Sequence, residues 1–142
     1  MRLLFVCSFS FFAVILTIQY YGQVNSVRIE KKQNGFELFK NDEPYYIKGA
    51  GAKSNFGELK KAGANSIRIW STNNKSYLDS AHKYGLTVTL GLWVAQERNG
   101  FNYDDQYAVA GQIALLKKDI LKLKDHPSLL MWGIGNEVDL QY

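Results

Sequence analysis

Residues Ser66–Trp93 read SIRIWSTNNKSYLDSAHKYGLTVTLGLW, and this stretch carries the main prediction of the fold class. Its two ends, Ser66–Trp70 and Thr87–Trp93, are short apolar runs that contain β-branched residues, which is typical of buried strands. Between them, Lys75–Gly85 is polar, and it ends at a glycine, where helices commonly stop. A strand, a helix and a second strand in this order predict a parallel sheet that is covered by helices.

The same alternation continues on both sides of this stretch. Asn55–Gly63 predicts a short helix, a long helix is predicted from about Tyr107 to Lys124, and Leu129–Gly135 predicts the last strand. The long helix repeats apolar residues at helical spacing, namely Val109, Ile113, Leu116, Ile120 and Leu123, and its lysines (117, 118, 122 and 124) should face outward. Before all of these, Val24–Lys48 favours an antiparallel hairpin that leads into a buried strand ending near Gly49. The sequence therefore predicts an α/β fold of about four βα units after a short β-hairpin.

Composition narrows the possible functions. The chain has 142 residues, of which 46% are hydrophobic and 21% are charged, and this excludes a disordered chain. The net charge of +4 is too small to favour nucleic-acid binding, and the acidic residues of the chain are interspersed among the basic ones. The single cysteine, Cys7, lies in the first apolar run, and both His82 and His126 are expected to be structural. We therefore expect neither a metal site nor a cofactor.

The first 22 residues have the three-part layout of a secretory signal peptide. Arg2 provides the positive start, Leu3–Ile18 is largely apolar, and the small Gly22 precedes a possible cleavage before Gln23. The apolar run has 16 residues, fewer than the roughly 20 that span a bilayer. We therefore expect export to the periplasm or the exterior, with cleavage and no stable membrane span afterwards; an uncleaved membrane anchor is the alternative.

The segment Gly49-Ala50-Gly51 raises the question of nucleotide binding, because it follows a predicted strand and precedes a predicted helix. A dinucleotide-binding fingerprint would need Gly or Ala where Ser54 stands. A phosphate-binding loop aligned on Ser54 would need glycines at Ile47 and Ala52. Both patterns fail, so we interpret these small residues as packing residues.

The clearest chemical signal is WGIGNEVD, residues Trp132–Asp139. Asn136 and Glu137 follow directly after the last predicted strand, and the carboxyl ends of parallel strands carry the catalytic residues of (β/α) barrels. A carboxylic acid there, partly shielded by Trp132 and Trp93, would act as a proton donor, and the neighbouring amide would bind a sugar hydroxyl. Asn-Glu pairs also cap helices, so the pair alone leaves that alternative open.

Three segments resemble, in order and spacing, strands two, three and four of the retaining glycoside hydrolases with TIM barrels (clan A). They are GANSIRIW (Gly63–Trp70), AHKYGLTVTLGLWV (Ala81–Val94) and HPSLLMWGIGNE (His126–Glu137). The chain is most similar to the family 2-like catalytic domain and to related β-glucanosyltransferase-like proteins, and PYYIKGAG (Pro44–Gly51) is similar to the lead-in to strand one. The resemblance implies that residues 23–142 form the N-terminal half of a (β/α)₈ barrel that hydrolyses O-glycosidic bonds of an oligo- or polysaccharide.

The resemblance also implies roles for individual residues. Glu137 matches the acid/base, Asn136 matches the residue that binds the sugar 2-hydroxyl, and Arg68 matches the arginine that supports the nucleophile. For Arg68, a buried structural ion pair is the alternative. Trp70 and Trp93 follow predicted strands and are candidate substrate-binding platforms, with core packing as the alternative. The loop Ala95–Gln106 contributes further candidates for lining the substrate cleft, namely Glu97, Arg98, Tyr103, Asp104 and Asp105. For most of them a solvated loop is the favoured interpretation.

Retaining glycosidases need a second carboxylate about 5 Å from the acid, as the nucleophile. In the resembled clan this residue follows strand seven, and a full barrel takes about 250 residues. We therefore expect this chain to be an N-terminal fragment that lacks the nucleophile and is inactive by itself. A β-glucan transglycosylase of the same clan and a non-catalytic carbohydrate-binding remnant are the alternatives. The sequence specifies neither the glycan nor the oligomeric state.

Overall fold

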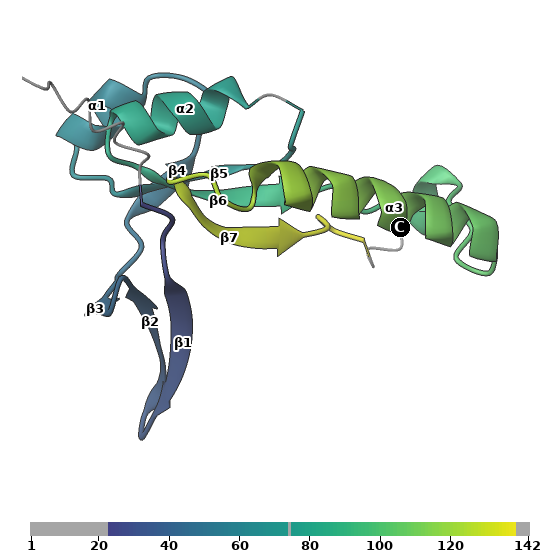
Figure 1. Cartoon of the computed structure of the whole chain (residues 1–142), viewed down its shortest axis with the longest axis horizontal. Coiled ribbons are helices and arrows are strands. Elements are labelled where there is room, and N and C mark those ends of the chain that lie inside the picture. Colours follow the sequence, from purple (N-terminus) through teal and green to yellow (C-terminus); the bar gives the residue numbers. More distant parts are fainter. Residues whose placement is uncertain (1–22, 74, 139–142) are drawn as a thin grey trace, which may run out of the picture.

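The computed structural model describes residues 23–73 and 75–138, which form a β-hairpin and a parallel sheet with helices (Figure 1). The predicted signal peptide over residues 1–22 lies outside the described residues, as does Asp139 at the end of the WGIGNEVD segment. None of the helices in the described part combines the length and the apolar character that crossing a membrane requires.

The N-terminal hairpin forms a small antiparallel sheet. Strand β1 (Val27–Lys32) pairs with β2 (Gly35–Lys40), and β2 pairs with the two-residue strand β3 (Glu43–Pro44). Figure 1 shows β1 and β2 projecting away from the parallel sheet. The Arg28 guanidinium lies over the ring of Phe39, which is the only buried hydrophobic residue among the strands of this hairpin.

The rest of the described chain alternates between strands and helices, as the sequence predicts. The elements are β4 (Gly49–Gly51), α1 (Phe56–Lys61), β5 (Ser66–Ile69), α2 (Ser76–Lys83), β6 (Thr87–Leu92), the 3₁₀ helix η1 (Glu97–Asn99), α3 (Gln106–Leu123) and β7 (Leu129–Ile134). The four strands pair in parallel in the order β4-β5-β6-β7. The predicted α/β fold, a hairpin followed by parallel βα units, is thus confirmed.

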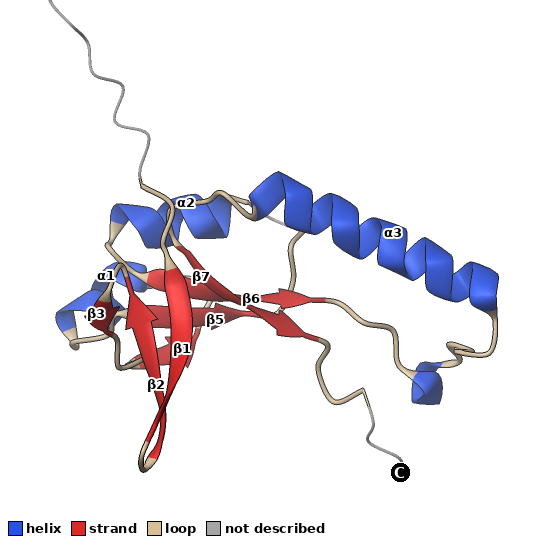
Figure 2. Cartoon of the chain, turned by 60° about the horizontal axis from the view of Figure 1, so that its bottom comes forward, coloured by secondary structure: helices blue, strands red, loops and turns tan. Residues whose placement is uncertain are grey.

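Strand register separates the sheet into two faces. Alternate residues point to opposite faces. Ile67 pairs with Val88, Ile69 pairs with Leu90, and these side chains face the helices. These side chains form the core with Phe56 of α1 and Leu78 of α2. Figure 2 shows α2 and α3 on the same side of this sheet. The opposite face carries the more polar side chains, and it is the face that a barrel would enclose.

The prediction of a buried strand that ends near Gly49 is wrong in both the position and the burial of the strand. Strand β4 begins at Gly49 and is exposed, and the preceding segment is irregular. The Asn65 side chain explains the difference, because it binds both the Tyr46 carbonyl and the Lys48 amide, each at 2.8 Å. The Tyr45 hydroxyl donates to the Asn65 carbonyl at 2.9 Å. Side-chain bonds to loop backbone therefore replace the strand ladder here.

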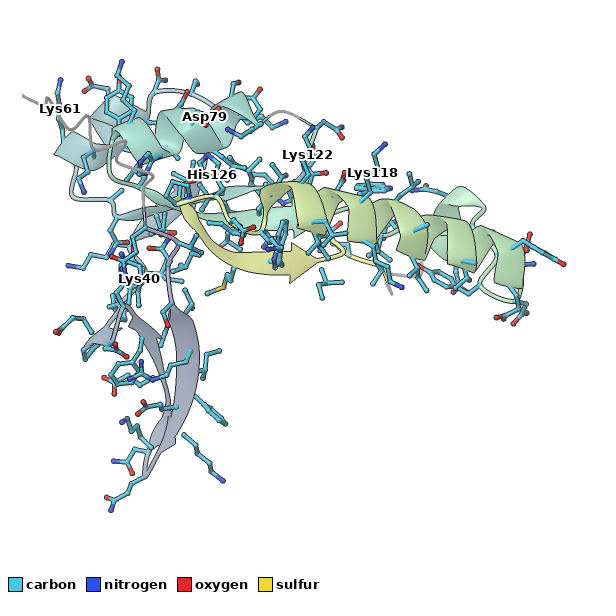
Figure 3. The ribbon with its side chains drawn as sticks, in the orientation of Figure 1. Lys40, Lys61, Asp79, Lys118, Lys122 and His126 are labelled. Carbon is cyan, nitrogen blue, oxygen red and sulfur yellow. The ribbon has the colours of Figure 1, made fainter. Side chains whose placement is uncertain are left out.

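Helix α3 is less buried than its periodicity predicts. Of the five apolar residues at helical spacing, only Leu123 is fully buried, and Ile113 is exposed. An 18-residue helix is about 27 Å long, whereas a six-residue strand spans about 20 Å. The helix therefore extends beyond the sheet (Figure 2). Its lysines are exposed as predicted, and Figure 3 shows Lys118 and Lys122 on the side away from β7.

Polar contacts hold the hairpin segment and α2 at the amino ends of the parallel strands. The Asn25 side chain donates to the Pro127 and Leu129 carbonyls at 2.7 and 2.9 Å. The Tyr45 hydroxyl also bonds to Thr87 at the start of β6, and burial raises the pKa of this tyrosine. These contacts lie at the opposite end of the strands from Asn136 and Glu137.

His126 links α2 to the start of β7 (Figure 3). Its Nδ1 accepts from the Ser128 amide at 3.2 Å, so Nε2 carries the proton and donates to Asp79 at 3.0 Å. This Asp-His-Ser arrangement resembles a hydrolase triad, but the Ser128 hydroxyl is buried and donates to the Leu78 carbonyl. His126 is therefore structural, in agreement with the sequence expectation.

We expect the 142-residue chain by itself to self-associate. Within residues 23–73 and 75–138, β4 and β7 each leave one edge unpaired, and unpaired edges template aggregation. Ile134 on β7 is 76% exposed. Light scattering should detect oligomers, and Ile134→Lys should raise the monomer fraction, whereas Ile29→Lys on the hairpin should not. A monodisperse, cooperatively melting wild-type monomer would contradict this expectation.

The Asp79–His126 bond should make stability depend on pH. Hydrogen bonds from His126 and Lys75 hold the pKa of Asp79 below its ordinary value. The ionised carboxylate therefore stabilises the fold above the unfolded pKa of about 3.9, and this contribution is lost as the pH falls through the lower folded pKa.

In the Ile134→Lys background, Asp79→Asn should lower Tm at pH 7, and the difference should shrink below about pH 4. The matched control is Asp125→Asn, an exposed carboxylate that pairs with the neighbouring Lys124. A difference in Tm between the Asp79 variant and its parent that stays constant from pH 7 to pH 2 would refute this role.

Candidate active site

Three predicted site residues meet at the carboxyl ends of β5 and β7. Arg68 on β5 points to the face opposite the core, and its Nη2 donates to the Asn136 side-chain oxygen at 3.4 Å. Its guanidinium carbon lies 5.4 Å from the ring centre of Trp70, within the range of a cation–π interaction. The parallel pairing of β5, β6 and β7 brings these residues together, although Arg68 and Asn136 are 68 positions apart. No ion pair of Arg68 with a carboxylate is present among the described residues.

Two glycines make room for Trp70. A Cβ on Gly51 would stand 2.2 Å from its ring, and a Cβ on Gly91 would stand 2.5 Å from its backbone carbonyl oxygen. Both distances are too short for any other residue without movement. The packing interpretation of Gly51 therefore agrees with the structure: this residue leaves room for the Trp70 ring, which explains the glycine without phosphate binding.

Glu137 follows β7 in a left-handed backbone conformation, with φ of 51°. Its side chain is 57% exposed, so the expected shielding by tryptophans is wrong. Trp132 pairs with Leu90, lies on the helix-facing side and packs against the core. Trp93 lines another cleft. The reason is register: Trp132 pairs with Leu90, and this row of alternate positions faces the helices.

Gln96 and Arg98 hold the backbone of this segment. Gln96 is only 5% exposed, and its Nε2 donates to the Asn136 carbonyl at 2.7 Å. Arg98 Nη1 donates to the Glu137 carbonyl at 2.8 Å. Sequence reasoning placed Arg98 near the cleft but missed Gln96 altogether. These partners are about 40 positions apart, and no local pattern connects them.

Trp93 lines a cleft to which neither Arg68 nor Asn136 contributes. It lines a cleft of about 850 Å³ between the ends of β5 and β6 and helix α3, together with Thr72 and Gln112. Thr72 hydrogen-bonds to Asp119 of α3 at the wall of this cleft. With 58% of its surface exposed, Trp93 presents a flat apolar ring to solvent. Of the two predicted tryptophan platforms, Trp93 therefore lines this cleft and Trp70 does not.

Two of the remaining candidates in the loop between β6 and α3 hydrogen-bond to backbone groups. Asp105 caps α3, because its carboxylate accepts from the Tyr107 and Ala108 amides at 2.9 and 3.1 Å. The Tyr103 hydroxyl donates to the Ala95 carbonyl at 2.6 Å. Glu97 and Asp104 are exposed. Among residues 23–73 and 75–138, no group of three His, Cys, Asp or Glu side chains is placed to hold a metal ion.

Comparison with solved structures identifies the fold. The chain is similar to a β-glucuronidase from Ruminococcus gnavus, with a TM-score of 0.58 and 22% identity over 81% of this chain. It is similar to β-glucuronidase 2 of Bacteroides uniformis, with a TM-score of 0.58 and 20% identity over 82% of this chain. It is also similar to the GH2 β-galacturonidase of Eisenbergiella tayi, with a TM-score of 0.55 and 25% identity over 79% of this chain. The chain has the fold of part of a family 2 glycosidase.

This family 2-like fold confirms the resemblance that the strand motifs indicated. The chain spans only 22%, 15% and 22% of those three proteins, respectively, so it corresponds to a minor part of each. No family model matches the chain. No curated protein matches it either.

Gly91→Ala should destabilise the fold by about 1–3 kcal/mol, because the added methyl group meets the Trp70 backbone, which cannot rotate away. Urea unfolding in the Ile134→Lys background measures this loss. The matched control is Gly111→Ala in α3, where nothing lies within 4 Å of the added atom. That change should stabilise the helix by up to about 1 kcal/mol. Equal stability of the two variants would show that the close approach at Gly91 is not required.

Proposed function

We propose that this chain is the first half of a TIM barrel in a retaining glycoside hydrolase, with Glu137 as its acid/base. One observation carries the proposal: Asn136 and Glu137 stand at the carboxyl end of β7, and Arg68 from β5 reaches the Asn136 side chain there. In barrels of this kind the carboxyl ends of the strands carry the chemistry.

The sheet supports the barrel part of the proposal. Its four strands are parallel, and in the described residues both outer edges are unpaired, as expected of a barrel that four further strands would close. One face packs on α1 and α2, and the other carries Arg68 and Thr89. The hairpin contacts the amino ends of the strands, away from the proposed chemistry.

In the proposed mechanism, each group has its own role. Glu137 protonates the leaving oxygen in the first step and then activates water as a base in the second. Asn136 binds a sugar hydroxyl next to the scissile bond. The Arg68 charge favours the ionised nucleophile, which the second half of the barrel would supply, and the half-exposed Trp70 ring offers an apolar surface to a sugar face.

The substrate is proposed as an O-glycoside. The similar solved proteins are named as β-glucuronidases and a β-galacturonidase, and the latter is bound to galacturonate. A second candidate is carbohydrate binding without hydrolysis, which the exposed rings of Trp70 and Trp93 favour. Export remains a prediction from residues 1–22.

The test is Glu137→Gln in the intact enzyme, where this chain is continuous with the rest of the barrel. The amide is nearly isosteric, so the fold should persist. Turnover of natural glycosides should fall by about 10² to 10⁴-fold, because protonation matters most for poor leaving groups. Activated aryl glycosides should still form the glycosyl-enzyme, and added azide should speed its breakdown. Steady-state kinetics with both substrate types measure these effects.

Glu58→Gln on α1 is the matched control, since that exposed glutamate pairs with Lys61 on the surface. It should leave both activities unchanged. Undiminished activity of Glu137→Gln on the natural glycoside would remove Glu137 from the mechanism. Carbohydrate binding without turnover by the wild-type enzyme would favour the second candidate.

A further inference from the structure

Arg98 holds Glu137 at two points. It belongs to η1, in the loop between β6 and α3, and its Nη1 donates to the Glu137 carbonyl at 2.8 Å. Its Nη2 lies 3.7 Å from the Glu137 carboxylate oxygen Oε2. The planar guanidinium fork therefore faces both the backbone and the side chain of one residue. Only a quarter of the Arg98 side chain is exposed, whereas more than half of the Glu137 side chain is.

The loop that carries Arg98 is anchored both to the end of β7 and to α3. The side-chain nitrogen of the buried Gln96 donates to the Asn136 carbonyl. The side-chain oxygen of Gln96 accepts from the Asn99 side chain at 2.6 Å. The Gln112 side chain of α3 accepts from the Ala95 amide at 2.6 Å. Helix α3 and β7 are thus connected through this loop, and Arg98 is held in place by more than its contact with Glu137.

Glu137 needs such support because of its backbone. Its φ of 51° lies in the left-handed region, which side chains other than glycine rarely adopt. A residue stays in that region only when its surroundings hold it there. The carbonyls of Asn136 and Glu137 flank the N–Cα bond of Glu137, about which φ is measured. Gln96 binds the first carbonyl and Arg98 binds the second.

We propose that Arg98 is a positioning residue that orients the Glu137 carboxyl group for proton transfer. The inference rests on the proposed acid/base function of Glu137. Arg98 is assigned no contact with substrate; it acts through Glu137. Without it, the exposed carboxyl group would sample several rotamers, and few of them would point at the leaving oxygen, although proton transfer requires hydrogen-bond geometry.

This role predicts a dependence on the leaving group. In the intact enzyme, Arg98→Ala should lower turnover of natural glycosides by about 100-fold, the loss typical of a misplaced catalytic group. Activated aryl glycosides, which leave without a proton, should lose no more than a few-fold in their glycosylation step. Guanidinium ion at non-denaturing concentration should restore much of the loss in Arg98→Ala, and Arg98→Lys should show an intermediate loss. A merely structural role would lower the turnover of both substrate types alike.

Two reference variants distinguish a failure of the proposed Arg98 role from a failure of the proposed Glu137 function. Arg28→Ala removes an arginine that pairs with Glu30 and Asp42 on the hairpin, and it should leave both activities unchanged. Glu137→Gln defines the full leaving-group effect. If Glu137→Gln shows that effect and Arg98→Ala lowers both activities equally or not at all, the positioning role is overturned while the proposed function stands. If Glu137→Gln itself shows no leaving-group effect, the proposed function fails, and the role of Arg98 fails with it.

Discussion

Parallel pairing of β5, β6 and β7 is the constraint on which the rest of the structure depends. The pairing sets Arg68 beside Thr89 and Thr89 beside Met131, so one row of alternate positions faces away from the helices. The other row, which includes Ile67 and Val88, forms the core. Because parallel strands end at the same edge, side chains at the carboxyl ends of β5 and β7 lie at one edge of the sheet. The contact between Arg68 and Asn136 is a consequence of this arrangement.

The two ends of the strands serve different purposes. At the amino ends, Asn25 and Tyr45 donate to backbone carbonyls and His126 bonds to Asp79. These bonds tie the hairpin segment and α2 to the sheet. At the carboxyl ends, Arg68 and Glu137 keep exposed polar surface. This separation of stability from chemistry is the usual division in TIM barrels, and it supports the proposed barrel.

Strained backbone occurs where the proposed chemistry lies, as it also does at Asn41, Asp42 and Asn55. Gly135 and Glu137 both have positive φ, and the loop after β6 binds the carbonyls around them. A chain that only had to turn after β7 would not require a glutamate in a left-handed conformation. Strain that neighbouring groups hold in place is common at functional sites, because it orients a side chain in a direction that relaxed backbone does not allow.

The sequence by itself determined the order of strands and helices and the position of Asn136 and Glu137 after a strand, because these follow from local periodicity and from glycine and proline positions. Only the tertiary structure decided the rest. It decided that Trp132 faces the core, that α3 overhangs the sheet, and that Gln96 and Arg98 hold the end of β7. The physical reason is distance along the chain: these contacts join residues about 40 to 70 positions apart, and strand register rather than local pattern brings them together.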